Sequence, residues 1–404
     1  MPTNVSSHAP NNPGGQAPYH PPDALSAKVE PVMSWIQRFW LRVSDGLKMD
    51  QLWKQFQADA RASYRLYSAD VDLEADASKP KWKHYLHLTG QFFWAVMEKL
   101  SPARRILLLV ALVLMFSPLQ TAIDNQTGTV FLRFDAHFWG AALLLLVLVL
   151  EVSDRVVMKR DLQIAKEIQT WLLPSHPPSI PGLEIAFATR PANTVAGDYY
   201  DVFPREYGDG GPHNYLLAVA DVAGKSIPAA LLMATVQSSL KTLAAGPLTL
   251  SELAHRMNVY ACSNSQDGRR FTTAFLAEYD PETHTLTYVN AGHNPPVLRR
   301  QSGAIERLEA GGIPLGILEA AQYDAGTATL HSGDWLVVFT DGVVEAENIN
   351  GEEYGEQRLQ FVVHMGAQLA PAALLQNLTA DLDRFVAGAP QHDDITCMLV
   401  KCSN

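Results

Sequence analysis

Cysteine is scarce in this chain, with three residues in 404, and their number and spacing exclude a disulfide framework and a cysteine-based zinc clip. Cys262, Cys397 and Cys402 are expected to be inert thiols in a reducing compartment. Clustered Lys and Arg are also missing, and the formal net charge of -11 argues against nucleic acid as a partner. The sequence contains no Gly-rich nucleotide cradle with its Lys and no recognisable Ser-His-Asp set.

The start of the chain lacks the apolar stretch behind basic residues that marks a signal peptide. Residues 1–31 are rich in Pro, Asn, Ser and Gly, so a disordered tail is predicted there. Residues 32–100 are predicted to be a helical region, and from Val32 to about Phe56 Trp, Ile, Phe, Val and Leu recur at helical spacing with basic residues between them. Such a basic, Trp-rich helix fits either a membrane surface or packing on other helices.

Two long hydrophobic runs follow. Ile106 to Ile123 carries no charge and has the length of a membrane span, whereas the apolar part of the second run, Phe138 to Leu150, is short for one and fits a buried core helix as the alternative. Lys and Arg flank both outer ends, and the loop between the runs holds Arg133 alone. We therefore predict two transmembrane helices over residues 104–152, in contact with lipid. The protein is expected in the inner (cytoplasmic) membrane, multi-pass, with the N-terminus and the remaining domain in the cytoplasm.

A charged connector helix is expected over residues 153–174, ended by the prolines that follow Leu173. Val157, Ile164, Ile168 and Trp171 form one apolar stripe along it. The stripe fits pairing with the next domain or with a second copy of the chain, so a homodimer is a possible assembly.

Residues 175–404 alternate between short strand-like runs and long amphipathic helices, which indicates an α+β sandwich. The expected strands are Tyr215–Val222, Thr272–Tyr279, Thr285–Asn290, Trp335–Thr340 and Ile395–Lys401. The expected helices are Pro228–Ala245, Ser251–Asn264 and Pro371–Val386.

Acidic residues stand at the ends of apolar runs in this region, where carboxylates are costly to desolvate. They are Asp198 in "AGDYYD", which also contains Asp201, Asp221 in "AVADVAGKS", Asp341 in "VVFTDGV", and Asp393 and Asp394 in "QHDDITCMLV". Hard oxygen ligands without His or Cys favour Mg²⁺ or Mn²⁺ over zinc, and two such ions can activate a water for attack on phosphorus. The alternative is that each Asp only caps a turn or a helix.

Eight motifs then occur in one order over about residues 160–401, and together they resemble the metal-dependent PPM-type (protein phosphatase 2C-like) serine/threonine phosphatases, in the bacterial SpoIIE/RsbU-like branch. The motifs are "LLP", "AGDYYD", "ADVAGKSIPAALLMA", "TTAFLAEYD", "YVNAGHNPP", "GGIPLGI", "FTDGVVEA" and "HDDITCMLV". The resemblance implies an α-β-β-α sandwich of two antiparallel sheets flanked by helices, with two Mn²⁺ or Mg²⁺ ions at one end.

The resemblance also assigns roles to residues. Catalysis is implied for Asp198, Asp221, Asp341 and Asp393, and metal binding for the same four together with the backbone carbonyl of Val222 and with Asp394. Asp393 aligns best with the last ligand of the family, and Asp394 follows closely.

Three further residues have open roles. The branch often has His-Gly where this chain has Lys225-Ser226, and Lys225 either places a cation near the phosphate or is simply solvated. His293 in "AGHNPP" either donates a proton to the leaving group or stabilises a turn, and the same alternatives apply to His392. Gly197 and Gly224 are expected to allow close backbone approach or a positive φ.

The sequence thus predicts a membrane-anchored, metal-dependent protein serine/threonine phosphatase that acts by attack of metal-activated water. Its implied substrate is a phosphorylated cytoplasmic regulatory protein of the anti-sigma-factor-antagonist type. One alternative is a catalytically silent, membrane-tethered docking module of the same fold. The other is phosphodiester or nucleotide chemistry, which the acidic charge balance disfavours.

Overall fold

The computed structural model describes residues 93–94, 97–117, 120–121, 134–205, 214–264 and 270–403. The predicted tail, most of the predicted helical region 32–100 and the loop between the two apolar runs lie outside these residues. The chain divides into two compact units between Val149 and Leu150. The predicted domain boundaries remain predictions.

The described residues of the first unit include one complete helix and the start of a second, longer one. Helix α4 (Pro102–Phe116) begins with Pro at a position where a missing N–H is tolerated. Strand β1 (Gln120–Thr121) pairs antiparallel with β2 (Phe134–Asp135), and α5 (Ala136–Leu172) follows at once.

The predicted transmembrane hairpin over residues 104–152 is not confirmed, because no described helix combines the length and the apolar character that crossing a membrane requires. Helix α4 has 15 residues, which span about 22 Å against about 30 Å of hydrocarbon. The second run does not form a separate helix either. It continues into the predicted connector as the single helix α5, since no Pro or Gly interrupts residues 141–172.

The described residues of the second unit form two sheets. The six-stranded sheet has the order β10-β7-β6-β5-β4, with β11 also paired to β7. Its strands are β4 (Tyr199–Arg205), β5 (Asn214–Val222), β6 (Thr272–Asp280), β7 (Thr285–Ala291), β10 (Gly311–Gly312) and β11 (Gly326–Thr329). All its pairings are antiparallel except that of β10 with β7, which is parallel.

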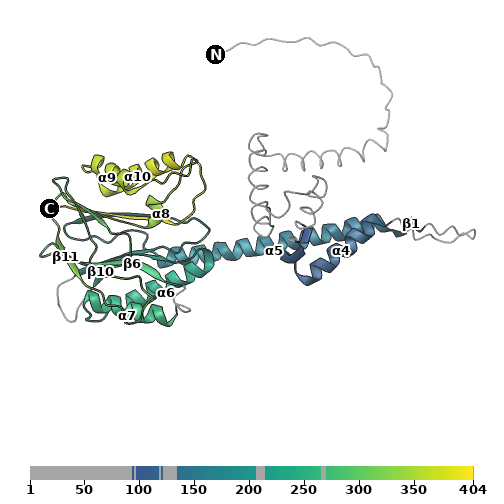
Figure 1. Ribbon diagram of the computed structural model, residues 1–404, viewed down its shortest axis with the longest axis horizontal. Coiled ribbons are helices and arrows are strands. Elements are labelled where there is room, and N and C mark those ends of the chain that lie inside the picture. The colour runs from purple at the N-terminus through teal and green to yellow at the C-terminus, as the bar shows by residue number, and fades with distance from the viewer. Residues whose placement is uncertain are drawn as a thin grey trace, which may run out of the picture. The chain divides into compact units, whose positions relative to one another are not determined.

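The five-stranded sheet has the order β3-β13-β12-β8-β9 and is antiparallel throughout. Its strands are β3 (Leu183–Arg190), β8 (Val297–Arg299), β9 (Ile305–Arg307), β12 (Trp335–Phe339) and β13 (Ile395–Cys402). Figure 1 shows helices on both sides of the stacked sheets. Helices α6 (Ser226–Ala244) and α7 (Leu250–Ser263) cover the six-stranded sheet, and α9 (Glu356–Met365) and α10 (Pro371–Val386) lie on the other side.

Three apolar clusters hold these layers together. The cluster between the sheets includes Leu217, Phe275 and Met398, and further clusters lie under α6 and α7 and under α9 and α10. Burial of apolar area on this scale is the main stabilising contribution to such a sandwich. The predicted α-β-β-α fold is confirmed, and the five predicted strands and three predicted helices match the observed bounds within two residues.

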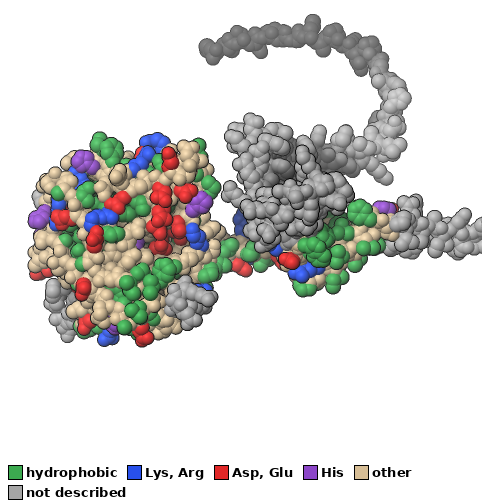
Figure 2. Space-filling model, in the orientation of Figure 1, with side chains coloured by type: hydrophobic (Ala, Val, Ile, Leu, Met, Phe, Trp, Pro, Cys, Tyr) green, Lys and Arg blue, Asp and Glu red, His purple; other side chains and the backbone are tan. Residues whose placement is uncertain are grey.

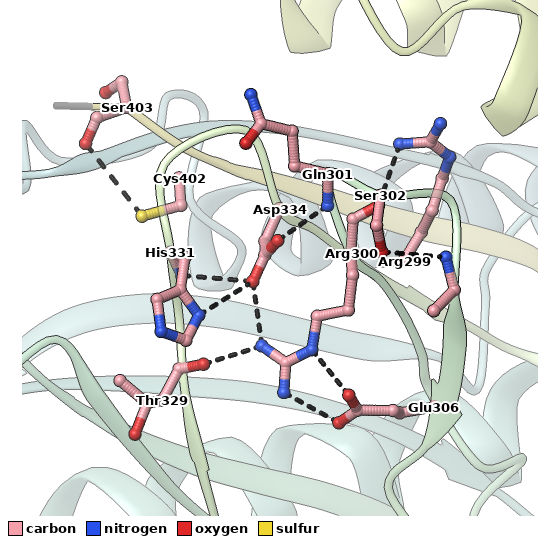
Figure 3. A network of polar contacts seen from close by, with 11 residues as sticks. Arg299, Arg300, Gln301, Ser302, Glu306, Thr329, His331, Asp334, Cys402 and Ser403 are labelled. Carbon is pink, nitrogen blue, oxygen red and sulfur yellow. Dashed lines mark hydrogen bonds and ion pairs between the residues drawn. The ribbon is translucent and has the colours of Figure 1, made fainter.

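A polar network ties the loops of the five-stranded sheet to its neighbour (Figure 3). The Arg300 guanidinium donates to both carboxylate oxygens of Glu306, to the Thr329 carbonyl at 2.7 Å and to Asp334 Oδ2 at 2.8 Å. Asp334 is buried and also accepts the backbone N–H of Gln301. The network therefore links β9, β11 and the turn before β12.

Candidate active site

The six-stranded sheet brings two of the predicted acids together. Asp198 directly precedes β4, and Asp221 is the penultimate residue of β5. These strands are antiparallel neighbours with Tyr199 opposite Ala220, so Asp198 and Asp221 lie at the same end of the sheet.

The five-stranded sheet adds the other acids. Asp341 follows β12 by two residues and begins the short helix α8 (Asp341–Val344). Asp393 and Asp394 directly precede β13, the antiparallel neighbour of β12. Four strands from both sheets therefore present their acids in one region.

These carboxylates lie close enough to change one another's pKa values. Burial, followed by the neighbouring carboxylate of Asp341, raises the pKa of Asp221 to about 7. Burial and then Asp221 raise the pKa of Asp198 well above its ordinary value, and burial and then Asp393 raise that of Asp341. Burial also raises the pKa of Asp394. The structure thus brings the five predicted acids into one group, in which each carboxylate acts on the pKa of at least one other.

The two adjacent acids of the last motif differ in their contacts. Both oxygens of Asp394 accept backbone N–H groups, from Ala192 at 2.7 Å and from Gly197 at 2.6 Å. Asp393 accepts the N–H of Asp394 at 2.9 Å with Oδ1, and its Oδ2 contacts Lys225. Asp394 therefore fastens the loop before Asp198, whereas Asp393 is the more available to a ligand.

Threonines support Asp198 from inside the sandwich. The buried Thr340 hydroxyl donates to Asp198 Oδ2 at 3.0 Å and accepts the backbone N–H of Thr396 at 3.0 Å. Since Thr340 lies between β12 and Asp341, it connects the acids of the two sheets.

The second acid of "AGDYYD" has a different environment. Asp201 is buried within β4, where it accepts the Tyr199 hydroxyl at 2.9 Å and the N–H of Val202 at 2.8 Å. Lys241 of α6 places Nζ 2.8 Å from Asp201 Oδ2. Asp201 is thus a compensated core acid and takes no part in the cluster.

The carbonyl of Val222 lies beside the turn that carries Asp198. A Cβ on Gly197 would stand 3.0 Å from the Val222 oxygen, so glycine is what permits this approach. Gly224 has φ +118°, in the region that favours glycine. Both expectations for these glycines are confirmed.

Lys225 is not simply solvated. Its Nζ lies 2.9 Å from Asp393 Oδ2 and also donates to the carbonyl of His392, although half of the side chain is exposed. Ser226, the next residue, has φ 64°, a conformation that non-glycine residues rarely adopt and that is over-represented at functional sites.

A groove of about 460 Å³ opens beside these residues. Its walls include Arg190, Lys225, Glu345, Asp383 and Asp393. In Figure 2 acidic side chains gather on the surface where Figure 1 places α8, with basic and histidine side chains next to them. Asp393 is the member of the acidic cluster that lines the groove.

The two histidines differ. His293 is buried, which lowers its pKa to about 4, and its Nδ1 lies 3.0 Å from the Thr273 hydroxyl. The side-chain amide of Asn290 donates to the carbonyl of His293 and accepts the backbone N–H of His293. This supports the turn-stabilising alternative for His293, whereas His392 is exposed on the groove wall.

The donor set suits a hard divalent cation, because the cluster consists of carboxylates and a carbonyl without His or Cys ligands. Within the described ranges, however, no group of three or more His, Cys, Asp and Glu side chains is arranged so that it could hold a metal ion. The residues fit Mg²⁺ or Mn²⁺ by their chemistry and mutual proximity, while their oxygens do not form a coordination shell.

Sequence reasoning missed two residues that support the acids. Thr340 directly precedes Asp341 within a quoted motif, but its hydroxyl contacts depend on strands far apart in the chain. Gln169 lies three residues before the "LLP" motif and contacts the backbone next to Asp198. Its burial among exposed residues of α5 has no signal in the sequence.

Comparison with known proteins agrees with the motifs. Residues 211–403 match the family model described as Stage II sporulation protein E (SpoIIE). The phosphoserine phosphatase RsbU of Bacillus subtilis (strain 168) is 33% identical over 195 residues, which are 48% of this chain and 56% of RsbU. Protein IcfG of Synechocystis sp. (strain ATCC 27184 / PCC 6803 / Kazusa) is 26% identical over 277 residues, 62% of this chain and 42% of IcfG. The chain thus spans about half the length of these curated relatives.

Among solved structures, the SiaA-PP2C domain of Pseudomonas aeruginosa superimposes with a TM-score of 0.53 at 20% identity. The match covers 62% of this chain and 99% of that domain. It shows that the sandwich has the PP2C fold.

Proposed function

The C-terminal part of this chain is a PPM-type domain of the SpoIIE/RsbU-like branch, and from this premise we propose that the protein removes phosphate from phosphoserine or phosphothreonine in another protein. The observation that carries the proposal is the convergence of five strand-end acids from both sheets beside one groove. Neighbouring carboxylates at one end of a core repel one another, which is unfavourable unless a bound cation compensates their charge.

Two Mn²⁺ or Mg²⁺ ions would be held by the carboxylates of Asp198, Asp221, Asp341 and Asp393 and by the carbonyl of Val222. When bound, such ions polarise the phosphoryl group and lower the pKa of a water molecule. Asp394 would support the ligands indirectly by holding the loop before Asp198, since both its oxygens already accept backbone N–H groups.

The chain's own side chains would bind and orient the substrate. Lys225 presents a positive charge to the groove next to Asp393, where it would attract the phosphoryl oxygens. His392, exposed on the same wall, is the histidine available to protonate the leaving alkoxide. In this proposal the attacking group is water, and no covalent intermediate forms on a side chain.

For the substrate, we propose a small phosphorylated cytoplasmic protein of the anti-sigma-factor-antagonist type. The motif resemblance and the name of RsbU, a phosphoserine phosphatase, support this class.

The first unit would attach the domain to the cytoplasmic face of a membrane. Its helices expose large apolar side chains, among them Val113 at 69%, Phe116 at 85% and Phe138 at 64%. Further along α5, Ile164 and Trp171 are also exposed and would pair two copies of the chain.

Substitution of the acids tests the proposed activity. Asp221→Asn and Asp341→Asn should each reduce Mn²⁺-dependent phosphate release from a phosphoserine peptide to background, because each removes a charged oxygen ligand. Circular dichroism should show that the domain remains folded. Asp324→Asn, at an exposed acid outside the cluster, is the matched control and should keep full activity.

Full activity in either cluster variant would remove that residue from the mechanism. A wild-type chain that binds the phosphorylated protein but releases no phosphate would favour the docking module instead.

A further inference from the structure

We propose that Gln169, in the last turn of α5, is a positioning residue that holds the turn carrying Asp198 in place. The proposal rests on the proposed function, because it concerns the same acidic site. It makes the end of α5 a structural part of that site.

The side-chain amide of Gln169 makes two bonds to one residue. Its Nε2 donates to the carbonyl of Ala196 at 2.7 Å, and its Oε1 accepts the N–H of Ala196 at 3.0 Å. Gln169 is 7% exposed, although Ile168 beside it is 48% exposed and Trp171 is 80% exposed. This end of α5 therefore inserts one polar side chain into the domain.

Ala196 needs such a partner. Strand β4 begins only at Tyr199, so Ala196 lies outside the ladder that would satisfy its backbone groups. The primary amide of Gln169 carries N–H donors and a carbonyl acceptor side by side, so it can satisfy both the C=O and the N–H of Ala196. Removal of the amide would leave buried backbone N–H and C=O groups without partners, which is strongly unfavourable.

The contact continues directly into the acidic cluster. The N–H of Gly197, the next residue, donates to Asp394 Oδ2 at 2.6 Å, and Asp198 follows. One chain of bonds thus runs from Gln169 through Ala196 and Gly197 to the acids of both sheets. A displaced turn would shift Asp198 and weaken the bond that fixes Asp394.

This arrangement predicts a specific defect. Without the amide, the acids would hold divalent cations less well, because the groups that orient ligands typically contribute about 10- to 100-fold to metal affinity or activity. Substrate binding in the groove would be unaffected, since Gln169 does not line it. Turnover would therefore fall while KM for the phosphopeptide stays unchanged.

The test compares Gln169→Met with Gln163→Ala in the full chain. Methionine keeps the length and volume of the side chain and loses both hydrogen bonds, so packing is preserved. Gln163 is exposed on the same helix and provides the control. Three quantities are measured: the Mn²⁺ dissociation constant by calorimetry, hydrogen exchange in peptides covering residues 193–200, and kcat and KM for phosphate release.

We expect Gln169→Met to bind Mn²⁺ about tenfold more weakly, to exchange faster over residues 193–200, and to lose kcat at constant KM. Gln163→Ala should match the wild type in all three. Gln169→Ala should show the same pattern with a larger loss, because it also leaves a cavity.

An unchanged Mn²⁺ dissociation constant in Gln169→Met would overturn the proposal, whether or not its melting temperature falls. If wild type and variant differ in Mn²⁺ binding as expected but neither releases phosphate, the proposed function fails and the positioning role stands. If both release phosphate equally, the positioning role fails and the function stands.

Discussion

At the scale of single residues, neighbouring acids in one motif have opposite roles. Asp198 and Asp201 are three residues apart in "AGDYYD", and both are almost fully buried. Asp201 is compensated by the ammonium of Lys241 and by the Tyr199 hydroxyl, whereas Asp198 faces other carboxylates. The availability of a cation within the fold therefore distinguishes a structural acid from a candidate ligand.

The pKa of Asp221 leads to a prediction about stability. Its value of about 7 in the fold exceeds the ordinary value of 3.8, so the folded chain binds more protons than the unfolded chain between these pH values. In the presence of a chelator, stability should therefore fall as pH rises through this window. Asp221→Asn removes the contribution, so the variant should melt at a higher temperature than wild type at pH 8.

The difference between the two proteins should vanish near pH 4, where Asp221 is protonated in the wild type as well. Thermal unfolding followed by circular dichroism at several pH values measures it. A variant with the same melting temperature as wild type at pH 8 would show that Asp221 is not under electrostatic strain.

The candidate site residues could be predicted because each lies in a motif at a strand end. The supporting contacts could not, for a physical reason. Thr340 and Gln169 act on backbone or carboxylate groups that are distant in the chain, and only the fold decides which groups come within hydrogen-bond reach. The contact of Lys225 with Asp393 depends in the same way on how α6 begins.

At the scale of elements, periodicity predicted the strands and helices of the sandwich well, whereas it did not predict that the second apolar run and the connector form one continuous helix. Helix α10 has its predicted bounds because Pro371 starts it and Ala387, with φ 50°, ends it. Helix α5 merges two predicted helices because hydropathy changes along it while helical propensity does not. A change from apolar to charged sequence therefore does not by itself mark the end of a helix.

The contacts of Arg300, which join several strands and turns, predict how substitution of Asp334 changes stability. Burial alone would raise the pKa of Asp334, but the Arg300 guanidinium and two backbone N–H groups lower it further than burial raises it. Asp334→Asn removes the charge that Arg300 pairs with (Figure 3), so stability at pH 7 should fall by about 1–3 kcal/mol.

Urea denaturation measures this loss, and Asp324→Asn again serves as the exposed control. The wild-type advantage should be present above about pH 4 and disappear as pH falls through the lowered pKa of Asp334. Equal denaturation midpoints for wild type and Asp334→Asn at pH 7 would show that the network adds no stability.

At the scale of the whole molecule, the sandwich contains its own cores. All members of the three apolar clusters lie between residues 173 and 402. A fragment of residues 160–404 also keeps Gln169 and both of its bonds to Ala196. We therefore expect this fragment to fold alone with an intact acidic site.

The full chain should differ from that fragment in association. Residues 1–159 include exposed apolar side chains of α4 and of the first part of α5, which should bind lipid, and the longer α5 should pair two copies. The full chain is thus expected to sediment with phospholipid vesicles and to form dimers. The fragment keeps Ile164 and Trp171 but loses Val157 and all of α5 before residue 160, so its remaining helix is too short to pair and it should stay in the supernatant as a monomer.

Sedimentation with vesicles and analytical ultracentrifugation separate the two effects, and phosphate release from the same peptide shows whether association changes turnover. Because Gln169 joins α5 to the Asp198 turn, pairing of α5 should alter kcat more than KM. Identical sedimentation, mass and turnover for the two proteins would reject both the membrane attachment and the control of the site through α5. Dimers with unchanged kcat would reject only the second, because they would show that α5 pairs without moving the acids.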